Sequence, residues 1–132
     1  MSENVHVIER LYEAWNRGDV DAVLDVCDAE VEVRPAFGVM LSSSVYRGHD
    51  GVKDWYEETY EPWAELRAVP ERFVEAGERT VVVVGLHARV AGGQVEVADE
   101  IAHVVTIHDG RIVRLDGYED PEAALATVGK AG

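Results

Sequence analysis

The sequence predicts one α+β domain in which helices pack on a strongly curved antiparallel sheet. At 132 residues, with 47% hydrophobic residues, the chain is long enough for a single domain with a real core. Apolar residues recur at three- and four-residue spacing in the first 60 residues and alternate with period two after residue 66. Because the helices come first and the strands follow in one run, we expect the curved sheet to wrap the helices and leave a cleft between them.

The first half of the chain predicts three helices. Apolar residues from Val5 to Trp15 form one face of an amphipathic helix, which ends at Arg17-Gly18. Asp19 is a good N-cap for a second helix whose apolar side carries Cys27. Residues 31–35 predict a short strand stopped by proline, residues 36–47 a loop, and residues 48–60 a third helix that ends near Pro62.

The second half predicts a meander. Residues 66–76 read as a strand in which Pro70 indicates an edge or a bulge. Residues 79–91 form a long strand, and Gly92-Gly93 turns the chain into residues 95–107. Asp109-Gly110 is a strong hairpin signal before a last strand over residues 111–118.

A short helix is predicted at the end of the sequence. Asp120 precedes the segment PEAALATV, whose proline occupies the first helical position. Aspartate at the N-cap and proline directly after it are both typical of a helix start. We therefore place the whole chain, residues 1–132, in one domain.

Charge and composition exclude several classes of function. The net charge of −14 argues against nucleic acid and against anionic membranes as partners, because both need clusters of Lys and Arg. With Cys27 as the single cysteine, no internal disulfide is possible. The N-terminus lacks the pattern of a signal peptide, and the run TVVVVGL is too short to cross a bilayer, so we expect a cytoplasmic protein. The chain has no GxGxxG or P-loop, which predicts no cofactor.

The strand over residues 95–107 carries the clearest sign of a site. Its odd-numbered residues share one face, and that face is apolar except for Asp99 and His103. A buried carboxylate is costly unless it is paired or faces a wet cavity. An apolar face with a few titratable groups is typical of a small-molecule pocket. The unperturbed pKa of a histidine, about 6.5, suits His103 to acid–base work.

His87 is predicted to join this site. If the Gly92-Gly93 turn closes a tight hairpin, residues whose numbers sum to about 186 pair across it, which sets His87 opposite Asp99. Asp99 and His103 would lie roughly 13 Å apart on one strand, too far for direct contact. The alternative to a catalytic role is that His87 and Asp99 form a structural ion pair in a wet cleft. Two histidines and one carboxylate also occur in metal sites, but the close ligand spacing is missing, so no metal is predicted.

Aromatic residues at helical spacing are usually core residues, but some are expected to line the mouth of the cleft. Tyr12 and Tyr118 could each donate a hydrogen bond to an oxyanion. The side chains predicted to line the pocket are Tyr12, Trp15, Trp55, Ile101, Val105, Leu115 and Tyr118.

Three segments carry a resemblance to a known family: ERLYEAWNRGDVDAVLD, YRGHDGVKDWYEE and IAHVVTIHDGRIVRLDGYED. Together they resemble the SnoaL-like branch of the nuclear-transport-factor-2-like superfamily over nearly the whole chain. The resemblance implies a cone-shaped, cystatin-like roll that encloses a pocket, and a homodimer formed through the sheet. It does not fix a function, because this fold serves ketosteroid isomerases, polyketide cyclases, epoxide hydrolases and non-enzymatic domains.

The family's catalytic positions carry over only in part. The basic aspartate of the cyclases falls on His103, as does the oxyanion-hole aspartate of the isomerases. The isomerase tyrosine falls on Leu11, with Tyr12 beside it, and the isomerase base falls near Arg34. The aspartate of limonene-epoxide hydrolases falls on Gly117. The resemblance therefore implies neither steroid isomerisation by that mechanism nor epoxide hydrolysis.

We expect a cofactor-independent lyase, isomerase or cyclase that acts on an apolar small molecule, and the resemblance implies that this molecule contains a carbonyl group. His103 is the expected acid–base group, assisted by His87 and Asp99. The alternative is a non-catalytic small-molecule-binding or assembly domain.

Overall fold

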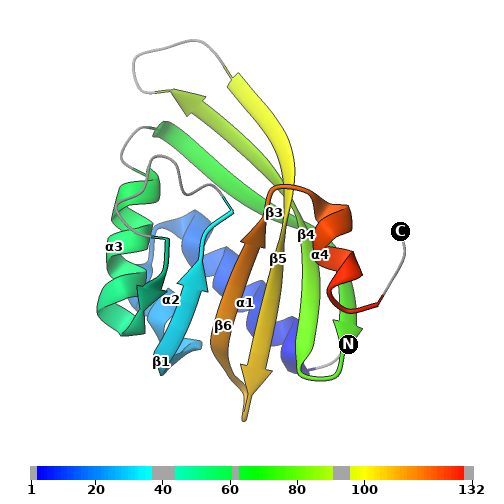
Figure 1. Ribbon diagram of the computed structural model, residues 1–132. Coiled ribbons are helices and arrows are strands. Elements are labelled where there is room, and N and C mark those ends of the chain that lie inside the picture. The colour runs from blue at the N-terminus through cyan, green and yellow to red at the C-terminus, as the bar shows by residue number, and fades with distance from the viewer. Residues whose placement is uncertain (1–2, 37–43, 61–62, 91–95, 130–132) are drawn as a thin grey trace.

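The computed structural model describes residues 3–36, 44–60, 63–90 and 96–129. Most helices come first along the chain and most strands come last, as the hydrophobic period of the sequence predicts (Figure 1). The elements are α1 (Glu3–Arg17), α2 (Val20–Asp25), β1 (Cys27–Arg34), β2 (Tyr46–Arg47), α3 (Gly48–Tyr60), β3 (Trp63–Ala76), β4 (Arg79–Val90), β5 (Glu96–His108), β6 (Arg111–Tyr118) and α4 (Pro121–Ala126).

The strands form one curved, six-stranded sheet with the order β2-β1-β6-β5-β4-β3. The strands from β3 to β6 make the predicted antiparallel meander, whereas β1 pairs with β6 in parallel. Pro70 predicted an edge strand or a bulge, and the structure has both: β3 is an edge strand, and its register shifts between Pro70 and Arg72. At the β5–β6 turn, Asp109 and Gly110 have φ angles of 51° and 77°, as a two-residue hairpin turn requires.

Both short helices begin as predicted. The side chain of Asp19 accepts a hydrogen bond from the N–H of Ala22 at the start of α2, and Asp120 accepts one from Glu122 at the start of α4. The placement of Cys27 in α2 is wrong. The helix ends at Asp25, because the carbonyl of Val26 accepts a hydrogen bond from Ile112 and draws the chain into the sheet.

The sheet has an inner and an outer face. The inner face packs against α1, α2 and α3 and buries the main core (Figure 1). The outer face is covered by α4 over part of β4, β5 and β6, where Ala124 and Leu125 meet Val81 and Val104. Residues on the two faces alternate along every strand, so the register decides which side chains enter the interior. Among the described residues, no helix has both the length and the apolar character needed to cross a bilayer.

Gly117 marks a point where the main chain crosses the inner face. It pairs with His103 across β5 and β6. A Cβ atom on Gly117 would lie 2.2 Å from the backbone nitrogen of Ala36. No side chain fits at this position, so the chain just after β1 lies directly over β6, beside His103. This contact also excludes the aspartate that the epoxide hydrolases carry here.

We predict that Gly117→Ala lowers the free energy of unfolding by about 1–3 kcal/mol, because backbone must move to make room. Gly85→Ala is the matched control, since the atoms nearest to a Cβ there belong to the carboxylate of Glu71, at the far end of a flexible side chain, and not to backbone. The control should cost less than about 1 kcal/mol. Urea unfolding of the three proteins measures both values, and equal losses would contradict the close approach at Gly117.

Candidate functional site

The inner face of β5 presents His103 to the interior of the domain. His103 pairs with Val82 of β4 on one side and with Gly117 of β6 on the other. Its neighbours on the same face of β5, Ile101 and Val105, are buried and apolar. The imidazole is therefore a polar group set into a largely aliphatic surface, and only 7% of its residue surface is exposed. Another buried polar side chain on this face is Thr80, which pairs with Val105 beside it.

Tyr12 reaches His103 from α1. Its hydroxyl oxygen lies 2.5 Å from Nδ1 of the imidazole, and the two rings are stacked with their centroids 5.9 Å apart. Tyr12 is 4% exposed, so both partners are withdrawn from water. Within the described residues, His103 has no other hydrogen-bond partner. We call this arrangement the Tyr12–His103 pair.

Burial keeps both members of the pair uncharged. It lowers the pKa of His103 to about 4 and raises the pKa of the Tyr12 hydroxyl well above its usual range. In both cases the cause is the cost of holding an ion away from water. At neutral pH the pair is therefore a neutral imidazole hydrogen-bonded to a neutral phenol. One proton lies in the hydrogen bond between them. If Nδ1–H donates it, the Tyr12 O–H and the lone pair of Nε2 remain, and if the Tyr12 hydroxyl donates it, Nε2–H remains.

Most residues predicted to line the pocket lie in the core around this pair. The main core contains Tyr12, Trp15, Trp55, Ile101, Val105 and Leu115. Trp15 is surrounded by aromatic rings: its ring centroid lies 4.6 Å from Trp55, 5.0 Å from Tyr56 and 5.5 Å from Tyr60. These helical aromatic residues fill the space between α1 and α3, so they hold α1 in the position from which Tyr12 reaches the sheet.

The predicted pairing of His87 with Asp99 is wrong. The hairpin closes one residue away from the expected register, so His87 pairs with Ala98 and Asp99 with Leu86. A shift of one residue moves a side chain to the other face, which sets His87 on the exposed outer face. The turn itself, Gly92-Gly93, lies outside the described residues.

Asp99 stays on the face of His103 but is not part of a buried site. Its carboxylate is exposed and accepts a hydrogen bond from the N–H of Glu100. Tyr118 is also displaced from the predicted pocket: it pairs with Ala102, packs beside α4 and belongs to the outer face. In the described part of the chain, no three His, Cys, Asp or Glu side chains gather as metal ligands do.

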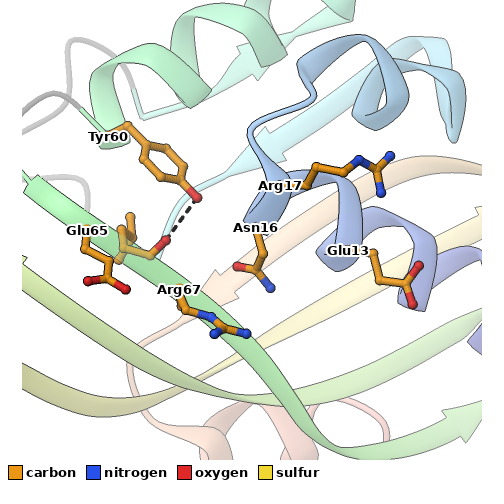
Figure 2. A pocket seen from close by; sticks show the side chains of 7 residues that line it. Glu13, Asn16, Arg17, Tyr60, Glu65 and Arg67 are labelled. Atoms are coloured by element: carbon orange, nitrogen blue, oxygen red, sulfur yellow. Dashed lines mark hydrogen bonds between the residues drawn. The ribbon is translucent and has the colours of Figure 1, made fainter.

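A pocket of about 640 Å³ lies at another place, between the ends of α1 and α3 and the edge strand β3 (Figure 2). Its lining residues are Glu13, Asn16, Arg17, Tyr60, Glu65, Leu66 and Arg67. The amide of Asn16 donates a 2.7 Å hydrogen bond to the carbonyl of Ala68 and accepts one of 2.8 Å from its N–H. The hydroxyl of Tyr60 lies 3.1 Å from the carbonyl oxygens of both Trp15 and Leu66. The central polar groups of this pocket are thus occupied in joining the helices to β3.

Sequence reasoning found His103 and Tyr12 separately but did not join them. The helical pattern set Tyr12 on the apolar side of α1, and the alternation of β5 set His103 inside. Their contact depends on how α1 crosses the sheet, which no local pattern contains. The pocket beside β3 was missed altogether, because Glu13 and Arg17 look like an ordinary solvated helix face.

Comparison with known proteins identifies the family and the fold. A SnoaL-like domain matches residues 8–115. The chain is a member of the SnoaL-like family. A comparison with curated proteins gives no match.

Solved structures show the same fold as this SnoaL-like protein. An NTF2-like protein of unknown function from Burkholderia pseudomallei is 26% identical, over 98% of this chain and 100% of the other, with a TM-score of 0.82. TerC, crystallised with polyporic acid, is 23% identical over 96% and 98% of the two chains, with a TM-score of 0.82. RV0760c from Mycobacterium tuberculosis, solved with estradiol-17β-hemisuccinate, is 16% identical over 91% and 95%, with a TM-score of 0.76.

We predict that His103 makes the protein less stable as the pH falls from about 6.5 to about 4. In this range the unfolded chain binds a proton at residue 103, whereas the folded protein holds that imidazole neutral until its pKa of about 4. Protonation therefore favours the unfolded state, by about 3 kcal/mol at the lower end. Urea unfolding at several pH values measures this loss in the native protein.

His103→Gln is the matched variant, because glutamine keeps a hydrogen-bonding group near Tyr12 but does not titrate. The loss of stability between pH 6.5 and 4 should be smaller in this variant by the stated amount. Identical pH profiles of the two proteins would show that His103 is not held neutral by burial.

Proposed function

We propose that this SnoaL-like protein is a cofactor-independent enzyme that moves protons on an apolar, carbonyl-containing small molecule. The observation that carries the proposal is the buried, uncharged Tyr12–His103 pair on a largely aliphatic face. If this position served only packing, two apolar side chains would be at least as stable, because burying polar groups costs free energy unless they are hydrogen-bonded. A hydrogen-bonding pair in an apolar interior is suited to recognise and polarise a carbonyl group.

The pair can transfer a proton without creating an ion. In one tautomer, Nδ1–H of His103 donates to the Tyr12 oxygen, and the lone pair of Nε2 is free. Nε2 then removes a proton from the carbon beside the carbonyl, Nδ1 gives its proton to the Tyr12 oxygen, and the Tyr12 hydroxyl gives its own proton to the carbonyl oxygen. The substrate becomes its enol, and His103 becomes the other neutral tautomer. Since no charge remains in the interior, the relay avoids the cost of burying an ion.

The basicity of His103 fits this step. With a pKa of about 4, the imidazole is about as basic as an ordinary carboxylate, yet it is uncharged at neutral pH. Tyr12, whose pKa is raised by burial, keeps its proton and can donate it to the developing oxyanion. Return of the proton at another carbon gives isomerisation. Attack of the enol on a second carbonyl of the same molecule gives cyclisation.

The small-molecule class is supported by the neighbours. TerC was crystallised with polyporic acid and RV0760c with estradiol-17β-hemisuccinate, two organic ligands held by proteins of this fold. His87 and Asp99 have no part in the proposed relay, because both are exposed and neither contacts the pair. A homodimer through the sheet, which the family resemblance implies, stays a separate prediction that gel filtration with light scattering can test.

We predict that the native protein exchanges hydrogen for deuterium beside the carbonyl of apolar ketones in D₂O. This reaction needs only the proton transfer proposed above, so the physiological substrate need not be known. Mass spectrometry of a panel of cyclic and aryl ketones measures the rate. Because general acid–base groups typically supply 10²–10⁴-fold, His103→Gln and Tyr12→Phe should each slow exchange by about 100-fold or more.

The control variants are His87→Gln and Asp99→Asn, which should exchange at the native rate. Loss of exchange in these two, with full activity in His103→Gln, would contradict the assignment of the site. A native protein that binds ketones but exchanges none of them would instead be a non-catalytic binding domain. That second function is favoured by one observation, namely that Tyr12 and His103 already satisfy each other in the core.

A further inference from the structure

The Tyr12–His103 pair offers a ligand few hydrogen-bond donors. A tyrosine hydroxyl and a neutral imidazole together have two N–H or O–H protons. One of them is used in the bond between Tyr12 and Nδ1, which leaves one donor: the Tyr12 O–H in one tautomer, or Nε2–H of His103 in the other. A carbonyl or a hydroxyl group can be satisfied by this set. A carboxylate or a phenolate needs several convergent donors when it is removed from water.

No described cation compensates an anion at this place. The neighbours of His103 on its own face are Ile101, Val105, Val82 and Gly117, which carry no charge. Thr80, which pairs with Val105 on this face, adds a hydroxyl but no charge. The pKa of His103 is lowered by burial, with no described charge acting on it, so the imidazole is not protonated at neutral pH. In the part of the chain that the structure describes, the site therefore holds no positive charge to offset an oxyanion.

The arginine that lies close along the chain points elsewhere. Arg34 pairs with Asp116 across β1 and β6, and Asp116 pairs with Val104 of β5. These residues alternate with Gly117 and His103, so they belong to the outer face. There Nη1 of Arg34 lies 3.7 Å from Asp116, and Nη2 lies 3.1 Å from Glu32. Arg34 is held among carboxylates on the far side of the sheet from the pair.

The net charge of the whole protein also disfavours an anionic ligand. A net charge of −14 repels an anion before it reaches the interior. The titratable residue nearest along β5 on this face, Asp99, is itself an acid and lies four residues away, roughly 13 Å. Donor count, missing counter-charge and overall charge all disfavour an ionised group beside the pair.

We infer that the site accepts, next to Tyr12 and His103, only an uncharged oxygen group such as a ketone or a protonated phenol, and rejects the phenolate or carboxylate of the same skeleton. This inference rests on the proposed function and narrows its substrate class. Charge elsewhere on the ligand is not restricted. The substrate must therefore come from a reaction that delivers a neutral ketone or phenol rather than a free acid at the reacting end.

The test uses 4-nitrophenol, whose ionisation changes its absorption spectrum and occurs near neutral pH. We expect the native protein to bind it with the spectrum of the neutral phenol. The Kd should rise about tenfold for each pH unit above the pKa of the free phenol. 4-Nitroanisole, which does not ionise, is the matched ligand, and its Kd should not change over the same pH range. Tyr12→Phe and His103→Gln should each weaken binding of the phenol by about tenfold.

The outcomes separate the two proposals. Binding that depends on Tyr12 and His103 but shows the phenolate spectrum, or a Kd that does not rise with pH, overturns the selectivity and leaves the site intact. Binding of neither ligand, or binding that both variants leave unchanged, overturns the proposed site itself and the selectivity with it. Asp99→Asn serves as the surface control and should reproduce the native pH profile.

Discussion

The hydrogen bond between Tyr12 and His103 joins the first helix of the chain to the middle of the sheet, across the core. It links residues 91 positions apart and depends on two arrangements at once: the side of α1 that faces inward and the face of β5 that carries His103. Packing of α1 by Trp15 and its aromatic neighbours sets the first. The pairing of β5 with β4 and β6 sets the second. The interior could not hold either polar group alone without leaving it unsatisfied.

The register of the sheet decides the chemistry of each face. Because His103 pairs with Val82 and Gly117, the residues flanking it in sequence, Ala102 and Val104, face α4 on the outer side. The same alternation sends Arg34 and Asp116 outward and leaves the inner face without their charges. The two faces thus differ around His103: the inner one is largely apolar there with a neutral polar pair, and the outer one carries ion pairs and the short helix α4.

The end of α1 is held by a separate set of bonds. Asn16 binds both backbone groups of Ala68 on the edge strand, and Tyr60 lies within hydrogen-bond distance of α1 and β3 together. These bonds use edge groups of β3 that would otherwise be free to pair with another strand. They also hold α1 one helical turn beyond Tyr12, since residues four apart lie on the same side of a helix. The pocket of Figure 2 lies where α1 and α3 are joined to β3 by these bonds.

The sequence by itself determined the fold and half of the site. Periods of 3.6 and 2 are local properties, so they located the main helices and the meander, and Asp19, Asp109-Gly110 and Asp120 marked their ends. The same alternation identified His103 as an interior polar residue. Tertiary structure decided the rest. Only the hairpin register could show that His87 lies outside, because one residue of slip exchanges the faces. Only the path of α1 over the sheet could bring Tyr12 to His103, since a contact between distant segments depends on packing and leaves no trace in local spacing.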